Sequence, residues 1–339
     1  MEAEVREQPE VFGRILAEGR PKIEGVARLL IDRRPRFVLF AARGTSDHAA
    51  LYGKYLVETL LGLPAGLVSP SSFTVYDARA EMRDVLLVAV SQSGCSPDLL
   101  EPLMRAQAGG AVTLAITNAP ESPLARAAEF HLDVLAGPER SVAATKTYTA
   151  QLLTLFLLIE AFAGRRVADP TMLPSRARDV LAMEEKIAML AVRYRFAEQI
   201  LVTSRGYNYP TAREAALKLM ETSYLVAHAF SGADLLHGPM AMIDKGFPVI
   251  AIVPPGPGGI AILPVLESLS ERGADTMVVG GETVTVRGTA RLVLPEIGPE
   301  VMSPIAMILP IQLLALHVAR QRGEDPDRPR SLQKITETW

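Results

Sequence analysis

The sequence predicts an α/β fold with two duplicated, doubly wound parallel sheets of flavodoxin-like type, and two observations carry this prediction. Short apolar runs alternate with helical segments, a pattern typical of a parallel sheet covered on both faces. The halves also share motifs. Arg43-Gly44 recurs 162 residues later as Arg205-Gly206, and Glu58 recurs 163 residues later as Glu221. A nearly constant spacing indicates duplication of one unit.

Composition narrows the class of protein. The 339 residues, 49% hydrophobic and 22% charged, can bury a large core in two or three domains. A net charge of -3 gives no reason to expect a nucleic-acid partner. Cys95 is the single cysteine, which excludes a disulfide within the chain and a cysteine-based zinc site. The N-terminus lacks a signal peptide's apolar core, and no apolar run reaches the ~20 residues of a membrane span. We expect a soluble cytoplasmic protein.

The first half contains five expected strands. Residues 1–36 have the apolar period of one or two leading helices. The apolar run 36–41 predicts the first strand, and the helix after it extends through Leu61. Further strands are expected at 65–68, 85–90, 111–116 and 129–134, with helices around 97–108, 122–128 and 147–163.

The second half repeats this alternation after a polar, proline-punctuated stretch at 165–174. A helix is expected near 175–194, followed by strands at 199–203, 248–253, 276–279 and 291–294. The predicted organisation is an N-terminal helical segment (1–22), a first domain (23–166), a second domain (184–322) and a C-terminal tail (323–339).

The strand 85–90 leads directly into a hydroxyl-rich loop, Ser91-Gln92-Ser93-Gly94-Cys95-Ser96, and then Pro97. Ser96 suits a helix N-cap and Pro97 the first helical position, so free backbone N–H groups and serine hydroxyls could surround an anion. Thr45-Ser46 also follows a strand, and ligands of such sheets bind beyond the carboxyl ends of strands. A phosphate is the expected ligand, although any strand-to-helix turn uses similar residues.

The helix after the second half's first strand places Glu214, Lys218 and Glu221 on one face. One interpretation is a solvent-exposed stripe with a Glu–Lys pair four residues apart. The other is a glutamate base with a lysine beside it in a cleft. The spacing fits both.

His237 precedes Gly238-Pro239, which terminates a helix. The structural interpretation is a histidine at a helix C-terminus, and the functional one is an acid or base for sugar-ring opening. His48 is expected to be structural.

Several motifs, spread over nearly the whole chain, occur in the same order as in the sugar isomerase (SIS) domain family, which the sequence therefore resembles. The resemblance is to the isomerase half of glutamine–fructose-6-phosphate aminotransferases and to the type II glucosamine-6-phosphate deaminases in particular. The motifs are Gly44-Thr45-Ser46, Ser91-Gln92-Ser93-Gly94, residues 142–146, residues 214–221, His237-Gly238-Pro239 and residues 329–334.

The resemblance implies a role for each matching residue. The sugar phosphate and nearby hydroxyls would contact Gly44, Thr45, Ser46, Ser91, Gln92, Ser93, Ser96, Val142 and Ala144. Glu221 would move a proton between C1 and C2 of the sugar, and Lys218 would lie beside this glutamate. His237 would assist ring opening from a neighbouring subunit of a homodimer, and Lys334 would contact the open-chain carbonyl or form an imine with it. Leu332, Ile335 and Trp339 suggest a docked tail, because a disordered end rarely carries three large apolar residues.

Departures from the family pattern favour a deaminase. The family's ammonia-releasing glutaminase domain has no counterpart in these residues, and Ala144 and Met220 replace a serine and a lysine. The expected reaction converts glucosamine 6-phosphate to fructose 6-phosphate and ammonia, with no metal or redox cofactor. Alternatives are an ammonia-using aminotransferase, a fructosamine-6-phosphate deglycase, a related aminosugar-phosphate enzyme and a non-catalytic sugar-phosphate sensor. A dinucleotide enzyme is disfavoured because the first turn lacks the G-x-G-x-x-G fingerprint.

Overall fold

The computed structural model describes residues 1–282 and 288–334, which form two compact units. The first-sheet unit contains Glu10–Arg140, Lys146–Asp169 and the tail from Leu332. The second-sheet unit contains Met1–Pro9, Ser141–Thr145 and Pro170–Ser331. Each unit is built around one five-stranded parallel sheet, which confirms the predicted α/β class.

The first sheet has the strand order β2-β1-β3-β4-β5, and every pair is parallel. Its strands are β1 (Phe37–Ala41), β2 (Ala65–Leu67), β3 (Val85–Ser91), β4 (Val112–Thr117) and β5 (Phe130–Asp133). All seven residues of β3 are buried, because helices cover both faces of this central strand. The five strands predicted from the sequence are confirmed to within a residue or two.

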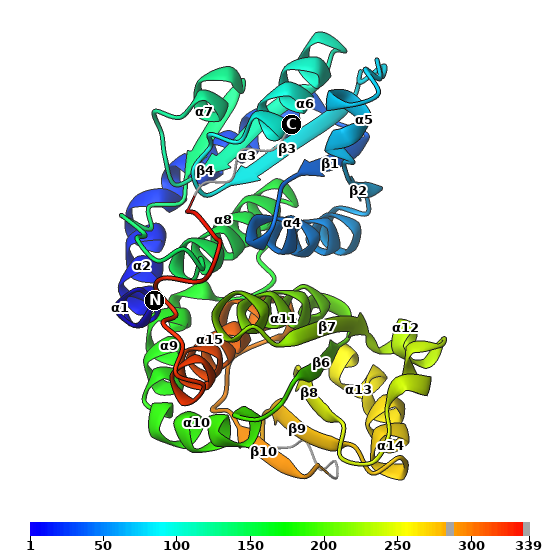
Figure 1. The fold of residues 1–339 in the computed structure, drawn as a ribbon. Helices are drawn as coiled ribbons and strands as arrows, with labels where there is room; N and C mark the ends of the chain where they lie inside the picture. The colour runs from blue at the N-terminus through cyan, green and yellow to red at the C-terminus, as the bar shows by residue number, and fades with distance from the viewer. Residues whose placement is uncertain (283–287, 335–339) are drawn as a thin grey trace. The chain divides into compact units, whose positions relative to one another are not determined.

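Helices cover both faces of the first sheet (Figure 1). One layer contains α3 (Arg20–Arg33), α4 (Thr45–Leu56) and α8 (Lys146–Phe162), which pack against one another. A π-helical turn, η2 (Val57–Leu61), extends α4 to the predicted end at Leu61. The other layer contains α5 (Pro70–Thr74), α6 (Pro97–Ala108) and α7 (Pro123–Ala127). Almost all of α8 is buried, as its apolar sequence predicts.

The second sheet repeats the same connection with the order β10-β9-β8-β6-β7. Its strands are β6 (Gln199–Ser204), β7 (Val226–Ser231), β8 (Pro248–Val253), β9 (Asp275–Gly280) and β10 (Ala290–Val293). In both sheets the second strand lies at an edge, next to the first, and the third, fourth and fifth follow. This shared order supports the predicted duplication.

The helices of the second-sheet unit also form two layers. One contains α9 (Leu173–Leu181), α10 (Glu184–Ala191), α11 (Tyr209–Ser223) and α15 (Ser303–Gln321). The first three of these helices all contact α15. The other contains α12 (Gly232–Leu236), α13 (Pro257–Ala261) and α14 (Leu263–Glu271). The chain begins with α1 (Glu2–Arg6) and α2 (Gln8–Arg14), joined to α3 by a π-helical turn, η1 (Ile15–Gly19).

Two elements differ from the sequence prediction. The strand β7 was not predicted, because its residues form neither a continuous apolar run nor a regular alternation, and its burial is irregular. The helix expected near 175–194 is two helices, α9 and α10, separated at Ala182 and Met183. The other predicted strands of the second half are confirmed.

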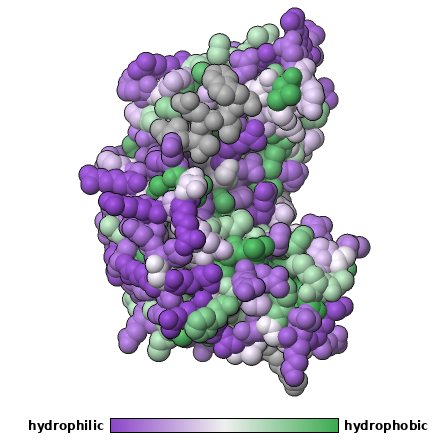
Figure 2. All heavy atoms as spheres, in the orientation of Figure 1, coloured by the Kyte–Doolittle hydropathy of each residue, from purple (hydrophilic) through white to green (hydrophobic). Residues whose placement is uncertain are grey.

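One helix, Glu300–Gln321, is long and apolar enough to cross a membrane by length and composition. However, 89% of its most apolar window is buried inside the protein. It packs against α9, α10 and α11, as the core helix of a sheet-covered unit does. Hydrophilic side chains cover much of the face drawn in Figure 2, with smaller hydrophobic areas between them.

Candidate active site

The predicted phosphate loop lies where the strand order of the first sheet changes direction. The neighbouring strands β1 and β3 lead into α4 and α6, so Thr45-Ser46 and the loop Ser91–Ser96 leave the same sheet edge side by side. Gly44 has a φ of +53°, a backbone conformation that glycine adopts without strain. Ser96 is the N-cap residue of α6 and Pro97 lies in its first turn, as predicted.

Hydrogen bonds within the loop fix its shape. The Ser91 Oγ accepts the Gly94 N–H at 3.0 Å, and the Ser93 Oγ accepts the Cys95 N–H at 3.3 Å. Gly94 has a φ of +63°, and a Cβ there would lie 2.1 Å from the Ser122 Oγ. Only glycine fits this position, because both its backbone angle and its close neighbour exclude a side chain.

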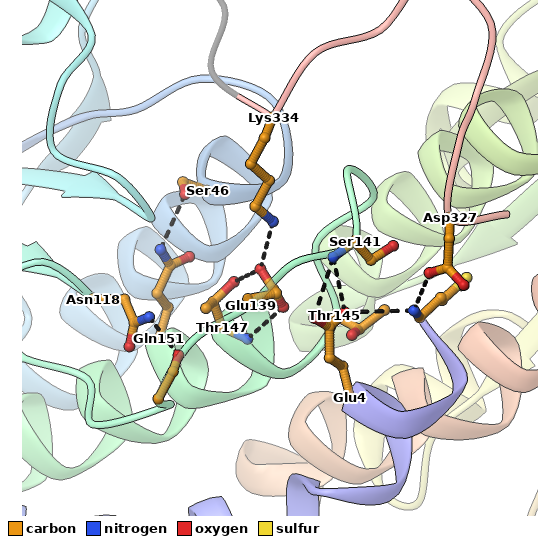
Figure 3. A network of polar contacts seen from close by, with 12 residues as sticks. Glu4, Ser46, Asn118, Glu139, Ser141, Thr145, Thr147, Gln151, Asp327 and Lys334 are labelled. Atoms are coloured by element: carbon orange, nitrogen blue, oxygen red, sulfur yellow. Dashed lines mark hydrogen bonds and ion pairs between the residues drawn. The ribbon is translucent and has the colours of Figure 1, made fainter.

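Two further hydrogen bonds fix the turns after β1 and β3 within the first-sheet unit. The Arg43 Nε, after β1, donates to the buried Asp98 Oδ2 of α6 at 2.6 Å, which joins the two strand-to-helix turns. The Ser46 Oγ accepts from the Gln151 Nε2 of α8 at 3.0 Å (Figure 3). Gln92, Ser93 and Ser96 remain partly exposed, and the Ser96 hydroxyl makes no capping hydrogen bond. These three residues are therefore partly accessible to solvent on a loop whose shape is fixed by hydrogen bonds.

The corresponding turn of the second sheet is filled by a carboxylate of the chain itself. Both Glu300 carboxylate oxygens accept the Gly258 N–H after β8, at 3.1 and 3.0 Å. A Cβ at Gly258 would lie only 2.3 Å from the Glu300 Oε1, so the glycine permits this close approach. Burial raises the pKa of Glu300, and the hydrogen bond from Gly258 partly opposes that shift. This contact was not predicted from the sequence, where its one signal is the glycine-rich run Gly256-Pro257-Gly258-Gly259.

The helix α11 carries the predicted carboxylates and begins with Asn208 as N-cap and Pro210 in the first turn. Lys218 is fully buried, and its Nζ lies 2.5 Å from the Glu221 Oε2 and 3.3 Å from the Glu214 Oε1. The interpretation as a solvent-exposed stripe is therefore wrong: the Glu214 side chain is also fully buried and that of Glu221 is 21% exposed.

Charge holds this cluster together. Burial by itself would lower the pKa of Lys218, but Glu214 and Glu221 outweigh burial and raise that pKa to about 12. Lys218 therefore remains a cation and holds Glu221 at the accessible end of the cluster. A carboxylate fixed in this way can accept and return a proton.

His237 is the C-cap residue of α12, which confirms the predicted position at a helix C-terminus. The next residue, Gly238, has a φ of +140°, and Pro239 starts a short 3-10 turn. The His237 side chain is exposed, and within the described part of the chain it makes no hydrogen bond or ion pair. The structure does not join it to Glu221.

Lys334 lies on the tail and belongs to the first-sheet unit. Its Nζ donates to the Glu139 Oε2 at 3.1 Å (Figure 3). Leu332 is 43% exposed, while Ile335 and Trp339 of the predicted docked tail lie outside the described residues.

The predicted site residues divide between the two units. The first-sheet unit holds Gly44, Thr45, Ser46, Ser91, Gln92, Ser93, Ser96 and Lys334. The second-sheet unit holds Val142, Ala144, Lys218, Glu221 and His237. Val142 and Ala144 are partly buried and follow Ser141, whose N–H is accepted by both Glu4 carboxylate oxygens at 3.1 and 3.3 Å. The predicted phosphate-binding hydroxyls therefore lie in the first-sheet unit, and the predicted proton-transfer glutamate lies in the second-sheet unit.

The second-sheet unit also contains a cavity of about 780 Å³ at the carboxyl ends of β8, β9 and β10. Its lining combines apolar side chains, such as Pro254, Ile260 and Leu294, with the carboxyl groups of Glu282 and Glu296. None of the predicted site residues lines it. In residues 1–282 and 288–334, no cluster of three or more His, Cys, Asp or Glu side chains is placed to hold a metal ion.

Comparison with known proteins identifies the repeated unit. A family model described as the SIS domain matches the chain twice, over residues 30–161 and 194–319. A curated relative from Methanothermobacter thermautotrophicus, a glutamine–fructose-6-phosphate aminotransferase (isomerizing), is 40% identical over 301 residues. That match covers 88% of this chain and 51% of the relative. The chain thus spans about half the length of the curated relatives it matches.

Solved structures show the same fold over the whole chain. The C-terminal domain of glucosamine–fructose-6-phosphate aminotransferase from Francisella tularensis superimposes with a TM-score of 0.87 and 29% identity, covering 96% of this chain and 97% of that one. A glucosamine-6-phosphate deaminase from Thermotoga maritima superimposes with a TM-score of 0.76 and 21% identity, covering 99% of both chains. At that identity the second comparison establishes the fold alone.

Proposed function

Because the chain belongs to the SIS domain family, we propose that it is an enzyme that interconverts aldose and ketose forms of a sugar phosphate. Its proposed reaction converts glucosamine 6-phosphate to fructose 6-phosphate and ammonia. The observation that carries this proposal is the cluster in which the buried Lys218 cation contacts both Glu214 and Glu221. A simple binding module does not require a fixed carboxylate beside a buried cation.

The proposed phosphate site is the edge of the first sheet between β1 and β3. Two features support it: the partly exposed hydroxyls of Ser93 and Ser96, and the N-terminus of the 12-residue helix α6. The corresponding turn of the second sheet is a poor anion site, because Glu300 already accepts its Gly258 N–H. We therefore expect one sugar phosphate per chain.

Proton transfer is the proposed task of Glu221. After the sugar ring opens, Glu221 removes the proton from C2 of glucosamine 6-phosphate and returns it to C1. A second proton passes from the C2 ammonium group to O1, so the product is the protonated imine of fructose 6-phosphate. Water then adds at C2, and ammonia leaves. General acid–base catalysis of this kind typically contributes about 10²–10⁴-fold to the rate.

Lys334 and His237 complete the proposal. Lys334 would contact the open-chain carbonyl, and His237 would assist ring opening from the second subunit of a homodimer. The exposed position of His237 is compatible with a role at another subunit. The homodimer and the cytoplasmic location remain predictions.

The residues of the proposed site can serve both directions of the reaction. The carried-over catalytic residues Glu221, His237, Lys218 and Lys334 all act on the sugar, and proton transfer between C1 and C2 is reversible. The curated relative is named an aminotransferase of fructose 6-phosphate, which favours the opposite direction, amination of fructose 6-phosphate. An ammonia-using aminotransferase is therefore the second candidate.

The test is ammonia release from glucosamine 6-phosphate. Galactosamine 6-phosphate, N-acetylglucosamine 6-phosphate and a fructosamine 6-phosphate serve as parallel substrates, and fructose 6-phosphate with ammonium tests the reverse direction. Release from glucosamine 6-phosphate alone supports the deaminase, and release from the fructosamine compound alone indicates a deglycase. If no substrate is turned over while a hexose 6-phosphate raises the melting temperature, the enzyme proposal fails and a sensor replaces it.

A further inference from the structure

Glu139 is a buried carboxylate that the proposed mechanism does not use, although it lies against the tail lysine. Its side chain is fully buried, and its Oε2 accepts from the Lys334 Nζ at 3.1 Å. The first turn of α8 supplies two more donors: the Thr147 N–H reaches the Glu139 Oε1 at 3.1 Å, and the Thr147 hydroxyl reaches the Oε2 at 2.6 Å. Figure 3 shows Thr147 and Lys334 meeting at this carboxylate.

The backbone that leads to Glu139 is fixed independently of the tail. The Asn118 side chain accepts the Ala136 N–H at 3.0 Å and donates to the Gly137 carbonyl at 2.8 Å. The Arg14 Nε donates to the Leu135 carbonyl at 2.7 Å. Because the loop and the first turn of α8 both belong to the first-sheet unit, the Glu139 carboxylate has a set position to which the tail attaches.

Lys334 lies three residues beyond the point where the chain passes from one unit to the other. The chain up to Ser331 belongs to the second-sheet unit, and only the tail from Leu332 belongs to the first-sheet unit. Leu332 is 43% exposed and the Lys334 side chain is 25% exposed, so both side chains remain in contact with water. A lysine has a long side chain with many rotamers, and a fixed acceptor restricts where its Nζ lies.

We propose that Glu139 is the positioning residue for Lys334: its carboxylate docks the tail on the first-sheet unit and places the Nζ for the open-chain sugar. An ammonium group has three N–H donors, so one can remain on Glu139 while another contacts the sugar carbonyl oxygen. This second role rests on the proposed function, whereas the docking of the tail does not. Thr147 supports the arrangement by holding both Glu139 oxygens.

The matched variants are Glu139→Gln, which removes the charge but keeps the shape, and Lys334→Met, which removes the partner. Glu129→Gln is the control, because it deletes a carboxylate of the same unit that pairs with Arg33 at the surface. Glu139→Asp restores the charge on a shorter side chain and tests for partial rescue.

The first measurement is tryptic cleavage after Arg330, followed by mass spectrometry of the intact full-length chain. We expect Glu139→Gln and Lys334→Met to accelerate this cleavage about 5- to 10-fold, since an undocked tail exposes the bond more often. Glu129→Gln should cleave at the wild-type rate. This measurement requires no turnover, so it tests docking even if the proposed reaction is wrong. Wild-type cleavage rates in both Glu139→Gln and Lys334→Met overturn the docking.

The second measurement is the kinetics of ammonia release. For Glu139→Gln we expect kcat to fall about 10- to 100-fold while KM changes less than about 3-fold, because the phosphate loop is intact. The double variant with Lys334→Met should be no slower than Lys334→Met alone, since both changes affect one group. Glu139→Asp should recover part of kcat. Additive losses, or a wild-type kcat in Glu139→Gln, overturn the positioning role. If the wild-type protein releases no ammonia, the proposed function fails and the positioning role fails with it, while the cleavage result still decides the docking.

Discussion

Lys218 shows at the scale of one residue how packing changes the meaning of a charge pattern. A lysine removed from water is strongly destabilising unless carboxylates compensate for its lost hydration. Here Glu214 and Glu221 both lie within ion-pair distance of the Nζ. The same three side chains on an exposed helix face would contribute only a few tenths of a kcal/mol. Because the cluster is buried, its ion pairs matter much more for the stability of the protein than the same pairs would at the surface.

Replacing Lys218 should destabilise the protein strongly. Lys218→Met leaves the fully buried Glu214 without its cation, so we expect the free energy of unfolding to fall by about 3–5 kcal/mol. Lys54→Met is the matched control, because Lys54 pairs with Glu58 on a partly exposed helix face and should matter by less than about 1 kcal/mol. Urea denaturation of both variants measures the difference. Equal losses would contradict this account of the cluster.

Because of Lys218, we also expect the stability of the folded protein to depend on pH in the alkaline range. Its pKa in the folded protein is raised to about 12 from 10.5, so the folded state holds the proton more tightly. The resulting stabilisation is fully present below pH 10.5 and is lost as the pH rises through about 12. Melting temperatures of the wild type and Lys218→Met should therefore converge over this range. Parallel curves for the two proteins would show that Lys218 is not the responsible group.

Glu221→Gln separates proton transfer from binding. The amide keeps the size of the side chain but cannot accept the proton from C2, so we expect turnover to fall by at least about 10²-fold. The proposed phosphate loop belongs to the other unit, so we expect the variant still to bind the substrate. Ammonia release measures the first effect, and the shift in melting temperature with glucosamine 6-phosphate measures the second. Full activity in this variant would remove Glu221 from its assigned role.

At the scale of the element, the turn after β3 is shaped by a glycine that accepts no substitute. Gly94 combines a φ of +63° with a Cβ position 2.1 Å from the Ser122 Oγ. Its N–H is accepted by Ser91, the last residue of β3. The turn therefore depends on a contact with α7's N-cap residue, Ser122, as well as on its own sequence.

Gly94→Ala tests the shape of this turn. We expect a loss of about 1–3 kcal/mol in stability from the strained φ and the clash, together with a higher KM for the sugar phosphate. Gly62→Ala is the control, because Gly62 has a similar φ of +66° with no atom within 4 Å of its Cβ position. It should lose about 1–2 kcal/mol from the backbone angle alone and leave KM unchanged. An unchanged KM in Gly94→Ala would argue against a ligand at this turn.

At the scale of the whole molecule, duplication supplied two similar sheets whose loops have diverged. The turn after β3 has exposed hydroxyls, whereas the turn after β8 is closed by Glu300. Conversely, the buried lysine–glutamate cluster occurs on α11, while the equivalent helix α4 has His48 and Tyr52 buried along it. The two copies therefore differ in their polar groups: partly exposed hydroxyls follow β3 in one, and a buried lysine–glutamate cluster lies on α11 in the other.

A mixing experiment tests the predicted homodimer. His237→Ala and Glu221→Gln should each be nearly inactive, but if His237 acts in the partner's site, mixed dimers contain one site with both residues intact. We expect activity to return when the two variants are unfolded and refolded together, and the same treatment of each variant alone is the control. Absence of any recovery, with mixed dimers verified by mass, would place both residues in one subunit's site.

The sequence alone determined the fold class, nine of the ten described strands, the duplication and the position of the hydroxyl-rich turn between β3 and α6. It could do so because apolar periodicity, N-cap residues and proline positions act over a few neighbouring residues. Only the tertiary structure decided that Lys218 is buried between two carboxylates, that Glu300 closes the second turn and that Glu139 receives Lys334. The Glu300 and Lys334 contacts join segments distant in sequence, and the burial of Lys218 depends on the helices packed against α11. No local pattern specifies which side chains meet in a packed interior.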